Sequence, residues 1–193
     1  MLLPHRLIAT AGLLVCAAVL PAAEPPAAAP AAAAANTTAP SNAPASLPIA
    51  VLADGAMAAL AACKANGYNV TVTIMDMDMT TRLVLRGDGA RDRTLEIGRR
   101  KAYTVARTGM SSGEFGKSVN APAGPAPAAV PGAPPPLPGP VNGDPSLIAW
   151  PGGLPIMQGG KVVGAMSVSG APGGDKDEAC VKAGLDKIAA AAK

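Results

Sequence analysis

Basic side chains crowd one stretch of the chain and make it the clearest candidate for binding an anion. Residues 86–107 carry Arg86, Arg91, Arg93, Arg99, Arg100, Lys101 and Arg107. An arginine guanidinium can hold a carboxylate through two parallel hydrogen bonds, which suits it to acidic ligands. Most of these cations are also explained as a solvated helix face that Glu96 partly balances, so we expect only one or two to bind a ligand. Arg86, which ends a predicted strand beside a glycine-rich loop, is one candidate.

A second cluster alternates sulfur and carboxylate groups from Met75 to Met79. Thioethers can bind Cu(I) or haem iron, whereas carboxylates bind hard cations. A strand that continued through this segment would place Met75, Met77 and Met79 on one face. We favour the simpler interpretation, in which Met75 packs in the core and Asp78 begins a turn, because methionine is ordinarily core filler. The sequence therefore does not identify any metal ligands.

The first residues have the pattern of a secretory signal peptide. A short basic start is followed by an apolar stretch, residues 7–20, that is too short to span a membrane. We therefore expect residues 1–23 to be removed and the protein to be exported, into a periplasm or as a secreted protein. Removal would take away His5, the only histidine. A mature chain without histidine could not form a Ser-His-Asp triad, a histidine zinc site or a histidine-ligated haem.

Two cysteines remain after that cleavage, Cys63 and Cys180. An exported pair favours a disulfide, because oxidising compartments outside the cytoplasm maintain such bonds. Both residues lie on predicted helices near the apolar stripe, so two buried thiols that act as small hydrophobes are the alternative. We expect no metal or redox role, because the two cysteines are far apart in sequence and lack neighbouring ligands.

Charge and aromatic content argue against nucleic acid as a partner. The formal net charge is +3, which is too balanced for a nucleic-acid-binding domain. The aromatic residues are only Tyr68, Tyr103, Phe115 and Trp150, too few for base-stacking platforms. The core must therefore be aliphatic, with methionine and alanine filling its gaps.

Two segments rich in alanine and proline precede and interrupt the predicted folded part. Residues 24–46 lack apolar periodicity, which predicts a disordered tether. Residues 121–145, with consecutive prolines at the centre, cannot form a helix or a central strand. We interpret this second segment as a surface insertion in a domain that spans residues 47–193. A lid over a pocket is the alternative interpretation, because long loops in compact domains are often functional.

Apolar spacing predicts the elements before the insertion. They are a helix over residues 52–66, a half-buried strand over 70–75, a returning strand over 81–86 and a helix over 94–109, capped by Thr94.

After the insertion, Gly159-Gly160 predicts a tight hairpin between two apolar runs, and a last helix follows from about residue 175. In the second run, one face carries only small side chains, among them Ala165, Ser167 and Ser169. Such a face lets a helix or a flat ligand come close to the backbone. The whole order predicts an α+β fold, with an antiparallel sheet and helices packed on it.

These patterns resemble the GlcG/HbpS family of small haem-binding proteins, which is related to the C-terminal domain of PduO. The motifs run Gly-Gly-Leu-Pro-Ile from Gly152, Gly-Gly-Lys-Val-Val-Gly-Ala from Gly159 and Asp-Glu-Ala-Cys from Asp177. The resemblance covers residues 48–113 and 150–190 and implies a profilin-like topology with assembly into dimers or larger rings. Because the motifs consist mainly of glycine and other small residues, they are more specific for the fold than for a ligand or a reaction.

The resemblance also implies where a ligand binds. Lys101, followed by Ala102, matches the family's Lys-Ala pair and is our first choice for holding a carboxylate such as a haem propionate. Asp76 matches an aspartate at the end of the first strand. With Arg86 and Thr104, these residues are the candidate ligand-binding set; no catalytic residue is assigned.

We expect a protein that binds haem or a related tetrapyrrole, for sensing, storage or scavenging, without catalysis. Without histidine, the haem iron would have a weak or open coordination, or a methionine, tyrosine or backbone oxygen ligand. The alternatives are an enzyme acting on haem or a small organic acid, and an accessory subunit of a periplasmic oxidoreductase. The expected partners are the small ligand and further copies of the chain, with no membrane span in the mature protein.

Overall fold

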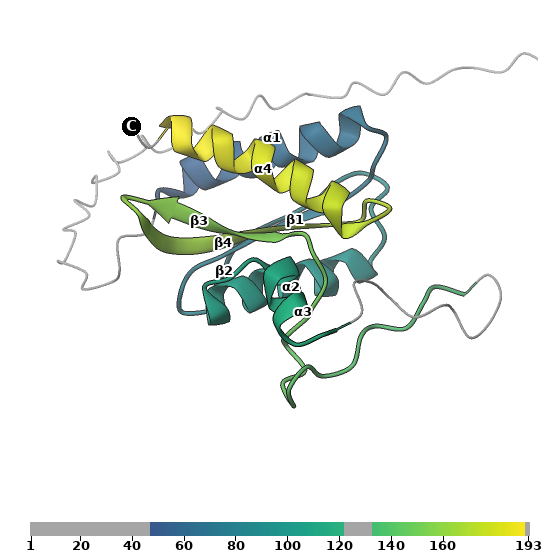
Figure 1. Ribbon diagram of the computed structural model, residues 1–193. Helices are drawn as coiled ribbons and strands as arrows, with labels where there is room; N and C mark the ends of the chain where they lie inside the picture. The colour runs from purple at the N-terminus through teal and green to yellow at the C-terminus, as the bar shows by residue number, and fades with distance from the viewer. Residues whose placement is uncertain (1–46, 122–132, 192–193) are drawn as a thin grey trace, which may run out of the picture. The chain divides into compact units, whose positions relative to one another are not determined.

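A computed structural model describes residues 47–121 and 133–191 of the chain (Figure 1). The predicted signal peptide, the predicted tether and residues 122–132 of the insertion lie outside these described residues. Helices and strands follow one another as α1 (Ile49–Ala65), β1 (Thr71–Met75), β2 (Thr81–Arg86), α2 (Arg93–Thr108), α3 (Ser112–Ser118), β3 (Gly153–Gln158), β4 (Lys161–Ser169) and α4 (Gly174–Ala191). The predicted α+β fold, an antiparallel sheet with helices packed on it, is confirmed. None of the described helices is long and apolar enough to cross a membrane.

The four strands form one antiparallel sheet in the order β2-β1-β4-β3. Each outer strand is joined to its inner neighbour by a hairpin, and the inner pair aligns Thr73 with Ser167 and Ile74 with Met166. The predicted β3–β4 turn is present. Gly159 and Gly160 have φ of 55° and 76°, the left-handed conformation that both positions of such a two-residue turn require.

One face of the sheet is covered by α1 and α4, which lie side by side (Figure 1). The main apolar core lies between them and the sheet and includes Leu52, Val72, Ile74, Met166, Val168, Val181 and Ile188. Gly184 lets the two helices approach, because a Cβ there would lie 2.7 Å from the carbonyl oxygen of Gly55. Cys63 of α1 and Cys180 of α4 form a disulfide with their Cα atoms 5.4 Å apart.

The opposite face is covered by α2, with α3 beside it (Figure 1). Here the sheet presents threonine, serine and alanine. The hydroxyl of Ser167 donates to the carbonyl oxygen of Gly98 at 2.7 Å, so α2 sits directly on the small-residue face. The close approach expected of that face is therefore made by a helix. A small cluster of Met75, Ala102, Val105, Ala106 and Ala165 completes this side.

Two local expectations were wrong, and one helix was not predicted. The strand around residues 71–75 is buried on both faces, because α2 covers the threonine side that periodicity had assigned to solvent. Thr94 does not cap α2: that helix begins at Arg93, and the Thr94 hydroxyl bonds instead to Thr71 at 2.6 Å. The short helix α3 was not predicted; the Ser111 side chain and Glu114 cap it reciprocally.

Within the described part of the insertion, residues 133–145 form neither a helix nor a strand of the sheet. A single bridge between Val141 and Asp144 is the only β-type pairing there. Prolines keep residues 134–140 extended, so backbone carbonyls of this stretch are free to accept hydrogen bonds from side chains elsewhere.

Candidate functional site

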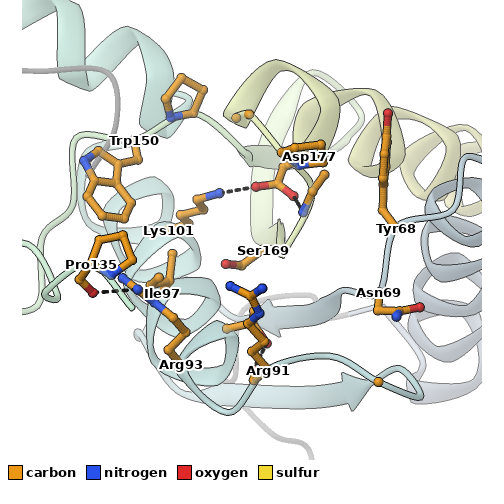
Figure 2. A pocket seen from close by; sticks show the side chains of 18 of the residues that line it. Tyr68, Asn69, Arg91, Arg93, Ile97, Lys101, Pro135, Trp150, Ser169 and Asp177 are labelled. Carbon is orange, nitrogen blue, oxygen red and sulfur yellow. Dashed lines mark hydrogen bonds and ion pairs between the residues drawn. The ribbon is translucent and has the colours of Figure 1, made fainter. Parts of the chain in front are cut away.

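A cavity of about 750 Å³ opens where α2 and α4 begin, at one end of the sheet (Figure 2). Its size lies within the range of about 300–1,000 Å³ typical of small-molecule sites. Loops supply most of the lining: the α1–β1 connection, the β2–α2 connection, the segment at Trp150-Pro151 and the β4–α4 connection. Its residues are Gly67, Tyr68, Asn69, Gly89, Arg91, Arg93, Thr94, Ile97, Lys101, Pro135, Trp150, Pro151, Ser169, Gly170, Ala171, Pro172, Gly173, Gly174 and Asp177.

The sides of the cavity are aromatic and apolar. Figure 2 shows Trp150 and Pro135 on one side and the ring of Tyr68 on the other. The chain has one Trp, two Tyr and one Phe, so half of its few aromatic side chains line this one cavity. Lys176 lies over the Tyr68 ring at 5.9 Å from its centroid. Aromatic side chains on two sides of a cavity suit a flat, conjugated ligand.

Two guanidinium groups supply positive charge to the lining. In Figure 2 the side chain of Arg91 points toward the space between Tyr68 and Lys101. Arg93 donates to the carbonyl oxygens of Pro135 at 2.6 Å and Pro136 at 3.3 Å. Within residues 47–121 and 133–191, neither arginine forms an ion pair with a carboxylate. The cavity therefore offers two cations to an acidic ligand.

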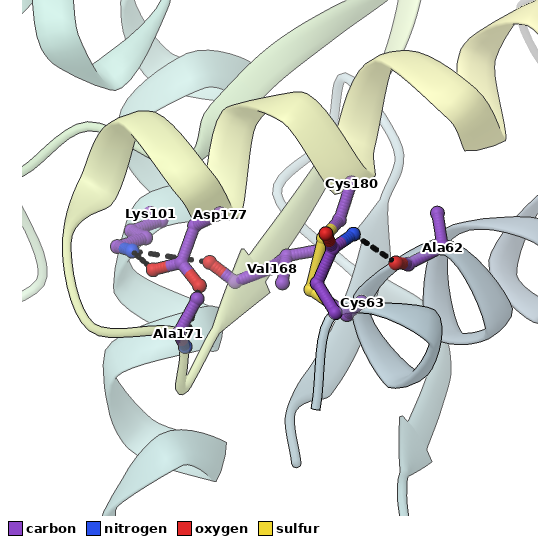
Figure 3. The surroundings of a disulfide bond; sticks show 8 residues. Ala62, Cys63, Lys101, Val168, Ala171, Asp177 and Cys180 are labelled. Carbon is purple, nitrogen blue, oxygen red and sulfur yellow. Dashed lines mark hydrogen bonds and ion pairs between the residues drawn. A yellow bond between two sulfur atoms is a disulfide. The ribbon is translucent and has the colours of Figure 1, made fainter. Parts of the chain in front are cut away.

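A buried ion pair forms the floor. The Lys101 ammonium donates to a carboxylate oxygen of Asp177 at 2.7 Å and to the Val168 carbonyl oxygen at 3.0 Å (Figures 2 and 3). The other Asp177 oxygen accepts the N–H of Ala171 at 2.9 Å, which fixes the β4–α4 connection. Only 2% of Lys101 and 3% of Asp177 is exposed. Burial lowers the pKa of the Lys101 ammonium and raises the pKa of the Asp177 carboxyl, because both charges have lost their water.

The described part of the insertion is fastened to α2 by arginines. Arg100, 3% exposed, donates to the carbonyl oxygens of Pro138 at 2.7 Å, Gly139 at 3.0 Å and Leu147 at 2.5 Å. Its Nε has no hydrogen-bond partner in the described structure. Together with Arg93, it holds residues 135–139 beside α2, and Pro135 becomes part of the cavity lining.

The four residues predicted to bind a ligand do not come together. Lys101 lines the cavity, but its ammonium is occupied by Asp177 and Val168. Arg86 donates to the Ala90 carbonyl oxygen at 2.7 and 3.0 Å and pairs with Asp92, outside the lining.

The other two predicted residues have local structural partners. Asp76 accepts the N–H groups of Asp78 and Thr80 and so shapes the β1–β2 turn. Thr104 is buried and bonds to the backbone of Arg100 and Ile148. The strand β1 ends at Met75, which packs in the core, as favoured from the sequence; the following methionines lie in the turn.

Sequence reasoning missed most of the lining. Arg91 belonged to the basic cluster, yet nothing in its spacing distinguished it from Arg99 or Arg107. Tyr68 and Trp150 are 82 positions apart by their numbers, and only folding brings them to one cavity. Asp177 stood in the family-like motif, but its partner Lys101 is 76 positions away. No local pattern can reveal such a pair.

Comparison with known proteins agrees with this architecture. Residues 47–186 match the family model described as haem degrading protein HbpS-like. The crystal structure of HbpS is 29% identical, with a TM-score of 0.61 over 74% of this chain and 90% of that one. A double mutant of HbpS from Streptomyces reticuli is 30% identical, with a TM-score of 0.61 over 83% and 97% of the two chains.

A crystal structure of a PduOC–haem complex shares the fold at 18% identity, with a TM-score of 0.60 over 74% of this chain and 95% of that one. No curated protein matches the chain. The family match covers most of the residues that the structure describes, and the solved structures named above share its fold. The chain therefore belongs to the HbpS-like family, and the resemblance seen in its sequence motifs is confirmed.

Proposed function

We propose that this protein binds haem or a closely related tetrapyrrole in the cavity between Tyr68 and Trp150. The observation that carries the proposal is a large cavity with aromatic side chains on two sides and two arginines that have no carboxylate partner among the described residues. The family supports it, since one relative of the same fold is described in complex with haem. Sensing, storage or scavenging would each use such a site.

The chemistry of the lining fits this ligand. A haem macrocycle is flat and apolar, so stacking between rings and contact with Ile97 and the prolines would bury it. Its two propionates are carboxylates: Arg91 can bind one through charge-assisted hydrogen bonds, and Arg93, whose Nη atoms also hold Pro135 and Pro136, adds positive charge beside the other. Bound haem would supply a redox-active iron and strong visible absorption. Lys101, our first choice from the sequence, would act indirectly by holding the floor in place.

The test is a haem titration followed by the Soret band and by Trp150 fluorescence. Trp150 is the only tryptophan, so a ligand in the cavity should quench the whole tryptophan signal. We expect saturable binding, weakened about tenfold in Arg91→Ala by loss of one charged hydrogen bond at an exposed site. Arg107→Ala, which removes an exposed arginine near the other end of α2, is the charge-matched control. A wild-type protein that gives no saturable Soret change and no quenching does not bind haem here.

Haem degradation is the second candidate, because the matching family model carries that description. Opening the macrocycle consumes oxygen and a reductant, so the loaded protein would lose its Soret band under air when ascorbate is added. A stable Soret band under those conditions, matched to free haem as a control, would favour binding alone.

We also propose that the protein acts after export and as an assembly of identical copies. Export rests on the signal-like pattern of residues 1–23, and assembly rests on the family resemblance. Mass spectrometry of protein secreted by its host, together with light scattering, would test both. An intact N-terminus or a monomeric mass would contradict the corresponding part.

A further inference from the structure

We propose that the cavity recognises the ring and the carboxylates of a tetrapyrrole and not its metal. Porphyrins without iron would then bind with about the same affinity as haem. This inference rests on the proposed function, because it names which part of the tetrapyrrole the site binds.

The lining lacks the usual side-chain ligands of haem iron. Among the described residues of the cavity, none is histidine, cysteine or methionine. Residues 122–132 carry none of these types in their sequence, and the one histidine is His5, within the predicted signal peptide. Histidine, thiolate and thioether groups are the ligands through which most haem proteins gain iron-dependent affinity.

Three further polar side chains of the lining, those of Lys101, Asp177 and Thr94, are already bonded, and Ser169 offers a hydroxyl, which is not among the side chains that usually hold haem iron. Lys101 could ligate iron only as a free amine, but its ammonium is held by Asp177 and by the Val168 carbonyl oxygen. Both carboxylate oxygens of Asp177 accept hydrogen bonds. The Thr94 hydroxyl bonds to Thr71 and to the Arg91 carbonyl oxygen. Freeing any of them would leave a buried polar partner unsatisfied, which is costly.

Tyr68 also lines the cavity, and a tyrosine side chain is one of those that hold haem iron in known haem proteins. Figure 2 shows its ring along one side of the cavity, with the hydroxyl oxygen at the end of the ring away from Asn69. This placement lets the ring face stack on a ligand, while the side chain on the opposite side, Trp150, cannot bind a metal at all. Tyr68 is therefore placed as a stacking surface, and its hydroxyl must be tested separately.

The groups that favour binding interact with the ring and the carboxylates, so their contribution to the affinity does not depend on the metal. Stacking on Tyr68 and Trp150 depends on the conjugated ring, and Arg91 and Arg93 address carboxylates. Haem, zinc protoporphyrin and metal-free protoporphyrin IX present the same ring and the same two propionates. Protoporphyrin dimethyl ester presents the ring without the carboxylate charges.

The experiment titrates the full chain with these four compounds and follows quenching of Trp150. We expect the three acids to bind within about threefold of one another and the dimethyl ester to bind at least about tenfold more weakly. A His5→Ala chain should give the same values. If haem binds more than about tenfold tighter than metal-free protoporphyrin, the inference is overturned while haem binding itself stands. If none of the four quenches Trp150, the proposed function fails, and this inference fails with it.

Tyr68→Phe separates stacking from ligation. Because phenylalanine keeps the ring, we expect haem and metal-free protoporphyrin to retain their wild-type affinities in this variant. A loss of haem affinity with no loss for metal-free protoporphyrin would show that the hydroxyl binds iron, and would overturn the inference. The absorption spectrum of the haem complex gives a second measurement, since it should be the same in wild type and Tyr68→Phe.

Discussion

The two faces of the sheet are held by different kinds of interaction. On the α1–α4 face, aliphatic side chains pack around Ile74, Met166 and Val168, and a disulfide ties the two helices together. On the α2 face, the sheet offers threonine and serine, and the helix is fastened by hydrogen bonds and buried charge. The first face is a conventional apolar core. The second is a polar interface that also builds the cavity.

The difference teaches which face can carry function. An apolar core gains free energy from area removed from water and needs no particular partner for each side chain. A buried polar interface is stabilised by hydrogen bonds between particular groups, so most of its polar side chains have a defined partner and position; the Thr73 hydroxyl and the Arg100 Nε are exceptions among the described residues. Loops anchored by such bonds can hold a binding site rigidly, as Asp177 does for the β4–α4 connection. The contrast predicts effects of different size on the two sides.

The largest effect should come from the disulfide on the apolar face. The bond joins residues 117 positions apart, and the chain-entropy model assigns about 4–5 kcal/mol to closing a loop of that length. Cys63→Ala with Cys180→Ala should lower the free energy of unfolding by about that amount, measured by urea denaturation. Haem affinity of the folded fraction should not change, since neither cysteine lines the cavity. An equal loss of affinity would show that the two faces are not separable.

The next effect should come from the buried ion pair, which joins Lys101 of α2 on the polar face to Asp177 in the first turn of α4. Lys101→Met leaves the Asp177 carboxylate buried without its partner and should cost about 3–5 kcal/mol. The double variant Lys101→Met/Asp177→Asn removes both charges, while the new amide oxygen can still accept the Ala171 N–H. Burial shifts the pKa of both groups toward their neutral forms, so the double variant should be more stable than the single one. A double variant as unstable as Lys101→Met would mean that the attraction outweighs the burial cost.

These two faces also explain how much the sequence could predict. Apolar periodicity found α1, α4 and both hairpins, because each buries an apolar stripe that repeats at the period of its element. It assigned the Thr71 and Thr73 side of β1 to solvent, since threonine counts as polar whether or not a helix covers it. The small side chains of β4 did indicate a close approach, and that approach is made by α2 at Gly98.

The site was less predictable than the fold for the same reason. Lys101 was singled out from the family-like Lys-Ala pair, and it does line the cavity. Its partners Asp177 and Val168 lie far along the chain. Sequence spacing therefore could not show that the Lys101 ammonium already donates hydrogen bonds to both of them. Arg100 looked like one more cation of a solvated face. Only the folded chain shows that it is buried against the insertion.

Arg100 should have an effect of intermediate size that is confined to the insertion. Arg100→Lys keeps the charge but loses the planar fork that reaches three carbonyl oxygens, so we expect about 2–3 kcal/mol of destabilisation. Hydrogen exchange should rise in residues 138–147 and not in α1. Arg107→Lys, an exposed change on the same helix, is the matched control. Unchanged exchange in the Arg100 variant would mean that the extended segment is held by other contacts.

The smallest effect should come from the cap of α3, and it sharpens the contrast between locally and globally held elements. The Ser111 hydroxyl accepts the N–H of Glu114 at 3.1 Å, and the Glu114 carboxylate accepts the N–H of Ser111 at 3.1 Å. A helix of seven residues cannot sustain itself by propagation, so these bonds matter to it. Helix α1, by contrast, has Pro48 at its N-cap position with no side-chain cap hydrogen bond, and it relies on its packing. Ser111→Ala should therefore lower the free energy of unfolding by about 1 kcal/mol, the usual value of a lost cap, as measured by urea denaturation.

The control is Ser118→Ala, which removes a hydroxyl from the other end of α3 and should lower the free energy of unfolding by less. Equal costs for the two serines would mean that α3, like α1, is held by packing and not by its cap.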